Sequence, residues 1–176
     1  MPSAANSAST QQHKQIAAQR GPVSLAVVTV SDSRTSETDT NGKYLRAEIE
    51  RLGHRLAAYH LVKDDAAQIA SLLTELLRSD AQILLFNGGT GIAPRDTTFD
   101  VLSRALEKTM PGFGELFRML SWEQVGSAAM LSRATAGVVG GKLVISTPGS
   151  PAAVKLAWEK LIAPELEHLA WELTRT

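Results

Sequence analysis

The chain has 176 residues, with 18 Lys and Arg balanced by 18 Asp and Glu, and a hydrophobic content of 44%. The zero net charge argues against a dedicated nucleic-acid or polybasic membrane partner, and the ordinary globular composition excludes wholesale disorder. The absence of cysteine excludes disulfides, thiolate zinc sites and a cysteine nucleophile, and it fits a reducing, cytoplasmic setting. No apolar run approaches the roughly 20 residues that span a bilayer, so we expect no membrane partner either.

Residues 1–20 differ in composition from the rest of the chain. They are rich in Ser, Ala, Gln and Thr and lack the apolar segment of a secretory signal. We expect a flexible N-terminal tail here; a transit peptide is the weaker alternative, because such peptides are usually richer in Arg. Residues 21–176 are long enough to form one domain with a substantial core.

Buried strands are predicted where β-branched and apolar residues run without alternation. Such strands are expected at residues 23–31, 82–86 and 142–147, and a further strand is expected at residues 55–62. Apolar residues at helical spacing predict helices over residues 41–52, around 69–77, over 99–106 and 113–122, and from about 151. Strands that alternate with helices predict an α/β fold, in which a parallel sheet lies between two helix layers. Residues 126–141 give no clear pattern.

Glycine and proline mark the expected helix ends. Gly53 should stop the first helix, Pro111-Gly112 should break the chain between two helices, and Pro164 should kink or restart the last one. Asp64 and Asp65 can cap the helix that follows the second strand.

The ends of the predicted strands carry similar residues. In open parallel sheets, ligands bind beyond the carboxyl ends of the strands. A polar or glycine-rich loop is ordinary after any single strand, but four such exits favour a functional edge that suits a phosphate or a cation. The four exits are Ser31-Asp32-Ser33-Arg34, Lys63-Asp64-Asp65, Gly88-Gly89-Thr90-Gly91 and Pro148-Gly149-Ser150.

The segment Gly88-Gly89-Thr90-Gly91 is the most informative exit. Its three glycines allow a ligand to approach the backbone closely and allow positive φ angles, so consecutive N–H groups can form an anion-binding nest. The segment matches neither the Walker loop nor the dinucleotide-binding fingerprint. A plain glycine turn is the alternative interpretation.

Asp96 follows this loop, close to a predicted helix start. It can act as a simple N-cap, or it can join Asp64 and Asp32 in a cluster of carboxylates. Carboxylates beside a phosphate site repel the phosphate unless a cation lies between them. The second interpretation therefore predicts Mg²⁺ with a nucleotide or pyrophosphate ligand.

Other candidates carry weaker signals. The four histidines show no metal-ligand spacing, so we expect no zinc site. Ser150 lacks the hydrolase nucleophile elbow and is interpreted as a loop donor. Arg133, after Ser132, can bind phosphate or form an ordinary surface pair. The three tryptophans are interpreted as packing residues or interface anchors rather than as a stacking platform.

Several motifs together resemble the MoaB/MogA family of molybdenum-cofactor biosynthesis proteins. They span roughly residues 23–170 in the family order, and residues 117–123 and 162–166 resemble the B-protein branch of the family. Lys63 departs from the Pro that is frequent in the adenylyltransferase branch. The motifs are Thr29–Arg34, Asp39–Gly42, Val62–Asp65, Gly88–Gly91, Pro94–Asp96, Pro111–Glu115, Ser132–Ala134 and Pro148–Ser150.

The resemblance implies a three-layer molybdopterin-binding fold and a homotrimer or homohexamer that works with other proteins of the same pathway. It implies adenylylation of molybdopterin by Mg²⁺-ATP, with release of pyrophosphate. The family's two functional aspartates correspond to Asp64 and Asp96, which are expected to align Mg²⁺ and phosphate. The glycine loop of residues 88–91 is expected to bind phosphate or nucleotide, Ser31 and Asp32 to line the nucleotide end, and Ser132 with Pro148, Gly149 and Ser150 to hold the pterin.

Three functions remain open at this stage. The protein can be the adenylyltransferase, a non-catalytic oligomer that carries molybdopterin, or a structural subunit that binds nucleotide. The presence of both aspartates favours the first function, whereas the B-branch segments favour the second.

Overall fold

The computed structural model describes residues 12–17 and 19–175 of the chain. Residues 1–11 and 18 of the predicted tail lie outside the described residues, whereas residues 12–17 are helical. Among the described residues, no helix is both long and apolar enough to cross a membrane.

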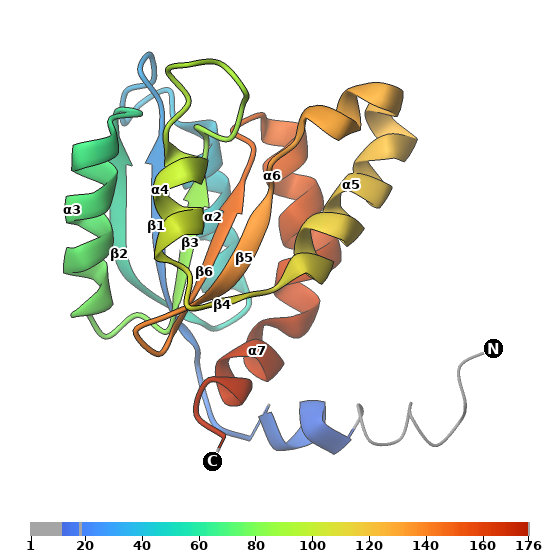
Figure 1. Ribbon diagram of the computed structural model, residues 1–176. Helices are drawn as coiled ribbons and strands as arrows, with labels where there is room; N and C mark the ends of the chain where they lie inside the picture. The colour runs from blue at the N-terminus through green and yellow to red at the C-terminus, as the bar shows by residue number, and fades with distance from the viewer. Residues whose placement is uncertain (1–11, 18, 176) are drawn as a thin grey trace.

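Six strands form one sheet in the order β2-β1-β3-β6-β5-β4. The first four strands in this order are parallel, and β5 and β4 are added antiparallel at one edge. The prediction of an α/β fold with a mostly parallel sheet is confirmed (Figure 1). The strands are β1 (Ser24–Val30), β2 (Arg55–Val62), β3 (Ile83–Asn87), β4 (Lys108–Thr109), β5 (Thr135–Val139) and β6 (Lys142–Thr147).

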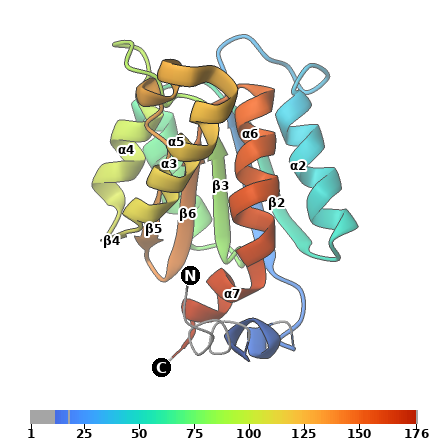
Figure 2. The ribbon, with the colours of Figure 1, turned by 90° about the vertical axis from the view of Figure 1, so that its right-hand side faces the viewer.

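Helices cover both faces of the sheet, α3 and α4 on one face and α2, α5 and α6 on the other (Figures 1 and 2). The helical segments are α2 (Thr40–Arg51), α3 (Ala66–Leu77), α4 (Thr98–Ala105), α5 (Pro111–Val125), α6 (Pro151–Ala157) and α7 (Leu166–Glu172), with a 3-10 turn η1 (Gly126–Leu131), a π-helical turn η2 (Trp158–Ile162) and a 3-10 turn η3 (Ala163–Glu165).

An apolar core lies between the sheet and the helices on each of its two faces. Ile69 and Leu76 of α3 pack with the sheet residue Phe86 on one face. Phe117 of α5 and Trp158 pack on the other, where both are 1% exposed or less. Burial of a large apolar side chain stabilises a fold by about 1.5–3 kcal/mol, so these two layers fix the sheet edge that carries the site.

Local signals account for most of the element boundaries. Asp65 caps α3 by accepting a hydrogen bond from the Gln68 N–H at 2.8 Å, and Gly53 follows α2 with a positive φ of 76°. Pro164 lies where the last helix tightens into η3 before α7 begins, so the predicted restart is confirmed. Pro111 occupies the first turn of α5, where its missing N–H costs no hydrogen bond.

Two strands have no counterpart in the prediction. β5 lies within the unclear segment, and β4 has only two residues, both exposed. A Cβ at Gly137 of β5 would lie 2.3 Å from the Lys108 carbonyl oxygen, so only glycine permits these strands to approach this closely. The predicted helix over residues 99–106 also ends earlier, because Leu106 has an extended conformation.

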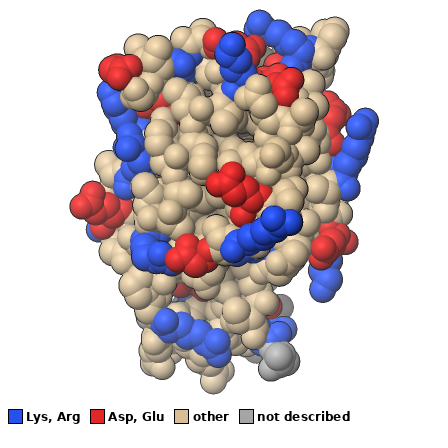
Figure 3. Space-filling model, turned by 90° about the vertical axis from the view of Figure 1, so that its left-hand side faces the viewer, with Lys and Arg blue, Asp and Glu red and all other residues tan. Residues whose placement is uncertain are grey.

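Charged side chains are dispersed over the face that α3 covers. Figure 3 shows basic and acidic residues interspersed there, with uncharged surface between them. This distribution agrees with the zero net charge, and it differs from the single-sign stripe of a typical nucleic-acid-binding face.

Candidate functional site

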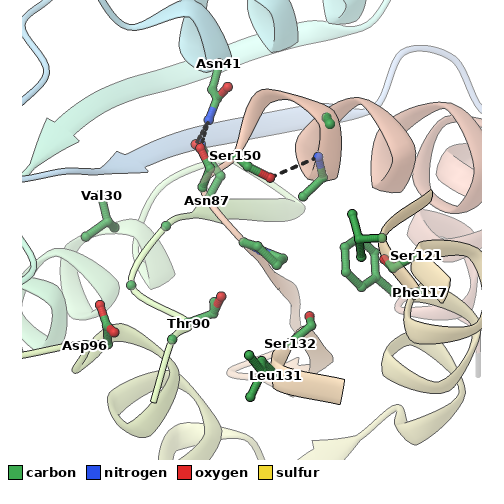
Figure 4. Close-up of a pocket in the computed structure, with 18 of the residues that line it drawn as sticks. Val30, Asn41, Asn87, Thr90, Asp96, Phe117, Ser121, Leu131, Ser132 and Ser150 are labelled. Carbon is green, nitrogen blue, oxygen red and sulfur yellow. Dashed lines mark hydrogen bonds between the residues drawn. The ribbon is translucent and has the colours of Figure 1, made fainter. Parts of the chain in front are cut away.

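A cavity of about 550 Å³ opens at the carboxyl ends of β1, β3 and β6. This volume lies within the range of small-molecule sites, and parallel sheets bind ligands at this edge. Most predicted site residues line the cavity: Ser31, Gly88, Gly89, Thr90, Gly91, Asp96, Ser132, Pro148, Gly149 and Ser150. Figure 4 shows that Thr90, Ser132 and Ser150 reach the cavity from separate segments of the chain.

A buried amide pair holds the inner wall of the cavity. The Asn41 side chain donates to Asn87 Oδ1 and to the Gly149 carbonyl, both at 2.9 Å (Figure 4). Asn87 in turn donates to Thr29 Oγ1 and to the Val28 carbonyl, both at 3.1 Å. The start of α2, the ends of β1 and β3 and the Gly149 turn are therefore fixed in one network.

The glycine loop after β3 adopts a conformation that requires glycine. Gly88 has a φ of 109°, and a Cβ there would lie 2.1 Å from the Val30 carbonyl oxygen. Gly89 also has a positive φ, of 64°. Within the described part of the chain, the N–H groups of Gly89, Thr90 and Gly91 donate to no protein acceptor. Such free N–H groups beside a cavity suit an anionic oxygen.

Asp64 and Asp96 lie beside different glycines of this loop and have different surroundings. A Cβ at Gly89 would lie 2.5 Å from Asp64 Oδ2, and one at Gly91 would lie 2.4 Å from Asp96 Oδ2. Asp96 lines the cavity, and it accepts a hydrogen bond from the Ala93 N–H at 3.1 Å. Both carboxylates therefore lie beside the same loop, and of the two only Asp96 borders the cavity.

The carboxylate of Asp64 caps α4 from outside the helix. Its Oδ1 accepts from the backbone N–H and the hydroxyl of both Thr97 and Thr98, at 2.9–3.1 Å. Its Oδ2 is buried and has no hydrogen-bond partner among the described residues. Thr97 itself makes no capping bond, so the predicted alternative of an N-cap applies to Asp64 rather than to Asp96.

Asp32 lies beside Asp64 rather than among the residues that line the cavity. Its Oδ1 accepts a hydrogen bond from the Asp64 N–H at 3.2 Å. The predicted proximity of these two residues is therefore observed.

Arg133 uses its guanidinium to hold the loop. It donates to the carbonyl of Thr90 at 3.1 Å, contacts the carbonyl of Gly91, pairs with Asp100 at 3.0 Å and stacks on Phe99. Of the two interpretations of Arg133, the structure favours the paired arginine.

Arg34 is the basic residue that lines the cavity. It donates to the Gly149 carbonyl at 3.3 Å and to buried Asp39 at 3.4 Å. Burial raises the pKa of Asp39, but hydrogen bonds from Gly42, Tyr59 and Arg34 outweigh it, so this pKa lies below its ordinary value. Burial and the bond to Asp39 raise the pKa of Tyr59 to about 12. Asp39 therefore stays ionised and balances Arg34.

The outer wall of the cavity is formed by α5 and η1. The site was predicted from loops that follow strands, so residues on these helical segments were not identified. Phe117, Ser121, Gln124 and Val125 of α5, with Leu131 of η1, line the cavity. Figure 4 shows Phe117 and Ser121 across the cavity from Thr90 of the glycine loop. This wall is largely apolar and suits a ring system. Asn41 and Asn87 were also absent from the predicted site: Asn41 lies at the start of a predicted helix, and Asn87 directly follows a predicted strand. Arg34 was included in the first strand exit, but no binding role was predicted for it.

Comparisons with known proteins agree with this architecture. The family model described as a probable molybdopterin binding domain matches residues 26–168. Molybdenum cofactor biosynthesis protein B of Bacillus subtilis (strain 168) is 51% identical over 170 residues, covering 95% of this chain and 98% of that protein.

Solved structures of the same family have a similar fold. A crystal structure of molybdenum cofactor biosynthesis protein B has a TM-score of 0.83 and 48% identity, covering 88% of this chain and 98% of that one. The tungsten cofactor synthesizing protein MoaB from Pyrococcus furiosus has a TM-score of 0.79 and 33% identity, with the same coverage. The chain therefore belongs to the molybdopterin-binding family that includes molybdenum cofactor biosynthesis protein B.

Proposed function

We propose that this protein acts in molybdenum cofactor biosynthesis and adenylylates molybdopterin with Mg²⁺-ATP, releasing pyrophosphate. The observation that carries the proposal is the cavity itself, in which free loop N–H groups, Arg34 and Asp96 surround one space of substrate size. The names of the relatives support a role in molybdenum cofactor biosynthesis. The geometry of the site supports the adenylylation reaction.

The proposed reaction requires positioning more than covalent chemistry from the protein. A phosphate oxygen of molybdopterin forms a bond to the α-phosphorus of ATP, and the bond from that phosphorus to pyrophosphate breaks. The attacking monoester oxygen is already anionic near pH 7, so no general base is needed. The loop N–H groups of residues 89–91 and Arg34 hold phosphate oxygens in line, which is the main protein contribution in such transfers.

The acidic residues fit a cation that accompanies ATP. Asp64 Oδ2 is a buried carboxylate oxygen without a hydrogen-bond partner in the described chain, and Asp96 borders the cavity beside Gly91 of the same loop. These two residues would hold Mg²⁺, which when bound neutralises charge on the phosphates. Ser31 and Asp32 would then lie at the nucleotide end, and Ser132 with residues 148–150 at the pterin end.

The decisive experiment mixes the protein with Mg²⁺-ATP and molybdopterin and detects adenylyl-molybdopterin and pyrophosphate. We expect Asp96→Asn to abolish turnover and to keep pterin binding, because the amide can still accept from the Ala93 N–H. Asp65→Asn is the matched control, since it removes one carboxylate charge next to Asp64 in the sequence and preserves the cap of α3. Unchanged turnover in Asp96→Asn would remove this residue from the site.

A carrier without catalysis is the second candidate. The observation that favours it is the commitment of Asp64 Oδ1 to four donors of α4. Molybdopterin binding without product, at enzyme concentrations equal to substrate, would support the carrier. A protein that binds ATP but does not bind molybdopterin would contradict both candidates and indicate a nucleotide-binding subunit.

We also propose that the protein forms a homo-oligomer through the outer face of α5. Leu116, Met119, Trp122 and Val125 are 47–62% exposed and each lies three residues from the next, so they are neighbours on the helix surface. Met130 extends this apolar surface onto η1. Exposed apolar patches of this kind mark association surfaces, and Val125 also lines the cavity.

Light scattering coupled to size-exclusion chromatography tests the assembly. Trp122→Glu should shift the protein to monomer, because it places a charge in the centre of the apolar surface. Glu123→Lys changes the charge of an exposed neighbour on the same helix and should leave the assembly intact. A monomeric wild-type protein, or an assembly that survives Trp122→Glu, would contradict this surface.

A further inference from the structure

We infer that His13, His168 and Glu172 form a binding site for a first-row divalent cation such as Zn²⁺. One ligand atom from each of the three residues lies within 4.8 Å of the other two. The site joins the helical residues 12–17 to α7, at the end of the sheet opposite the cavity (Figures 1 and 2). The histidine pattern alone predicted no zinc site, because the two imidazoles are 155 residues apart in sequence.

The α7 helix supplies two of the ligands from one face. His168 and Glu172 are four residues apart, so their side chains are neighbours on the helix surface. His168 Nε2 lies 3.6 Å from Glu172 Oε1. Glu172 Oε1 also pairs with Arg175 Nη1 at 3.2 Å, which leaves the second carboxylate oxygen available to a cation.

The orientation of His168 matches that of a metal-binding histidine. Its Nδ1 lies 3.1 Å from Glu165 Oε2. A hydrogen bond from Nδ1–H to a carboxylate leaves the lone pair of Nε2 free, and this arrangement supports metal-ligating histidines in many proteins. Lys14 contacts the same Glu165, which is the last residue of η3 and directly precedes α7. The helical residues 12–17 are therefore joined to the start of α7 as well as to the site.

Packing restricts both imidazole rings. The centroid of the Trp171 ring lies 5.0 Å from that of His13 and 6.0 Å from that of His168, and Trp171 is only 8% exposed. A rigid apolar surface behind two imidazoles lowers the entropic cost of holding them in one geometry.

The donor set indicates the class of cation. Two imidazole nitrogens and one carboxylate oxygen suit Zn²⁺, Ni²⁺ or Co²⁺ and discriminate against Mg²⁺ and Ca²⁺, which prefer oxygen ligands. Three protein ligands leave a position for water. A bound cation would therefore link the helical residues 12–17 to α7 and hold them together.

Binding of the metal alone tests the inference. The full chain is stripped with a chelator and titrated with Co²⁺, followed by its visible absorption, and with Zn²⁺, followed by calorimetry. We expect one equivalent to bind, and saturating Zn²⁺ to raise Tm by about 5 °C. We also expect Zn²⁺ to slow tryptic cleavage after Arg20, which follows the helical segment.

Variants distinguish the site from incidental binding. His13→Ala and His168→Ala should each weaken Zn²⁺ binding by about tenfold or more, and Glu165→Gln should weaken it by a similar factor through His168. His60→Ala on β2 is the matched control for loss of one imidazole and should bind as the wild type does. Absence of stoichiometric binding, or binding that persists in both His13→Ala and His168→Ala, would overturn the inference.

Discussion

Asp64 offers a test that separates a structural role from a chemical one. We expect Asp64→Ala to destabilise the fold, because Oδ1 is the acceptor for four donors at the start of α4. Thr98 is fully buried, so water cannot replace the lost acceptor at its N–H and hydroxyl.

The size of the effect follows from the bonds that are lost. Loss of a helix cap costs about 0.5–2 kcal/mol, and a buried donor without an acceptor costs about 1–3 kcal/mol. Together they predict a loss of about 3 kcal/mol, or a fall in Tm of about 6–12 °C for a chain of this size. Asp64→Asn keeps an oxygen at the Oδ1 position and should cost only about 1 kcal/mol.

Urea unfolding followed by far-ultraviolet circular dichroism, at one fixed protein concentration, measures both variants. Asp65→Asn controls for the loss of one charge and should lie within about 0.5 kcal/mol of the wild type, because Asn caps helices as well as Asp does. Equal stability of Asp64→Ala and the wild type would refute the capping argument. If Asp64→Asn is stable but inactive, the chemical role of the carboxylate is separated from its structural one.

Three further predictions concern the site. Gly88→Ala should destabilise the protein far more than Gly53→Ala, since both have positive φ but only Gly88 faces a carbonyl oxygen, at 2.1 Å from the added Cβ; comparable unfolding midpoints would contradict this. The lowered pKa of Asp39 contributes stability above about pH 3.9 that is lost as pH falls through the folded-state value. Asp39→Asn should therefore flatten the stability profile between about pH 2 and pH 5, and a parallel profile would argue against this assignment. Arg34→Ala should weaken ATP binding about tenfold or more in calorimetry, as expected for one charge-assisted hydrogen bond; unchanged affinity would remove Arg34 from the phosphate site.

The sequence was sufficient to predict the parallel part of the sheet, because β1, β3 and β6 are continuous apolar runs that need cover on both faces. It did not predict β5, whose small residues and Gly137 carry little strand signal. The pairing of β5 becomes clear only beside β6 and the Lys108 carbonyl. Antiparallel edges of this kind depend on contacts between segments rather than on local pattern.

The position of the glycine loop and of Ser150 could be predicted from the direction of the strands alone. The glycine loop and Ser150 follow parallel strands, so the topology brings them to one edge. The roles of Asp64 and Arg133 were not predictable in the same way. Each side chain forms hydrogen bonds with residues that are about 33 to 43 positions away in the sequence. These partners are brought together only by the fold.

The Gly149 carbonyl accepts hydrogen bonds from both Arg34 and Asn41, which has a consequence for how the family can diversify. The half of the cavity beside Gly149 is held by these hydrogen bonds before any substrate arrives, so little conformational entropy is lost there when a ligand binds. Substitutions in the α5 half can then change which ring system is accepted while the geometry of the proposed phosphate site stays constant. New substrate preferences should therefore arise on that helix first.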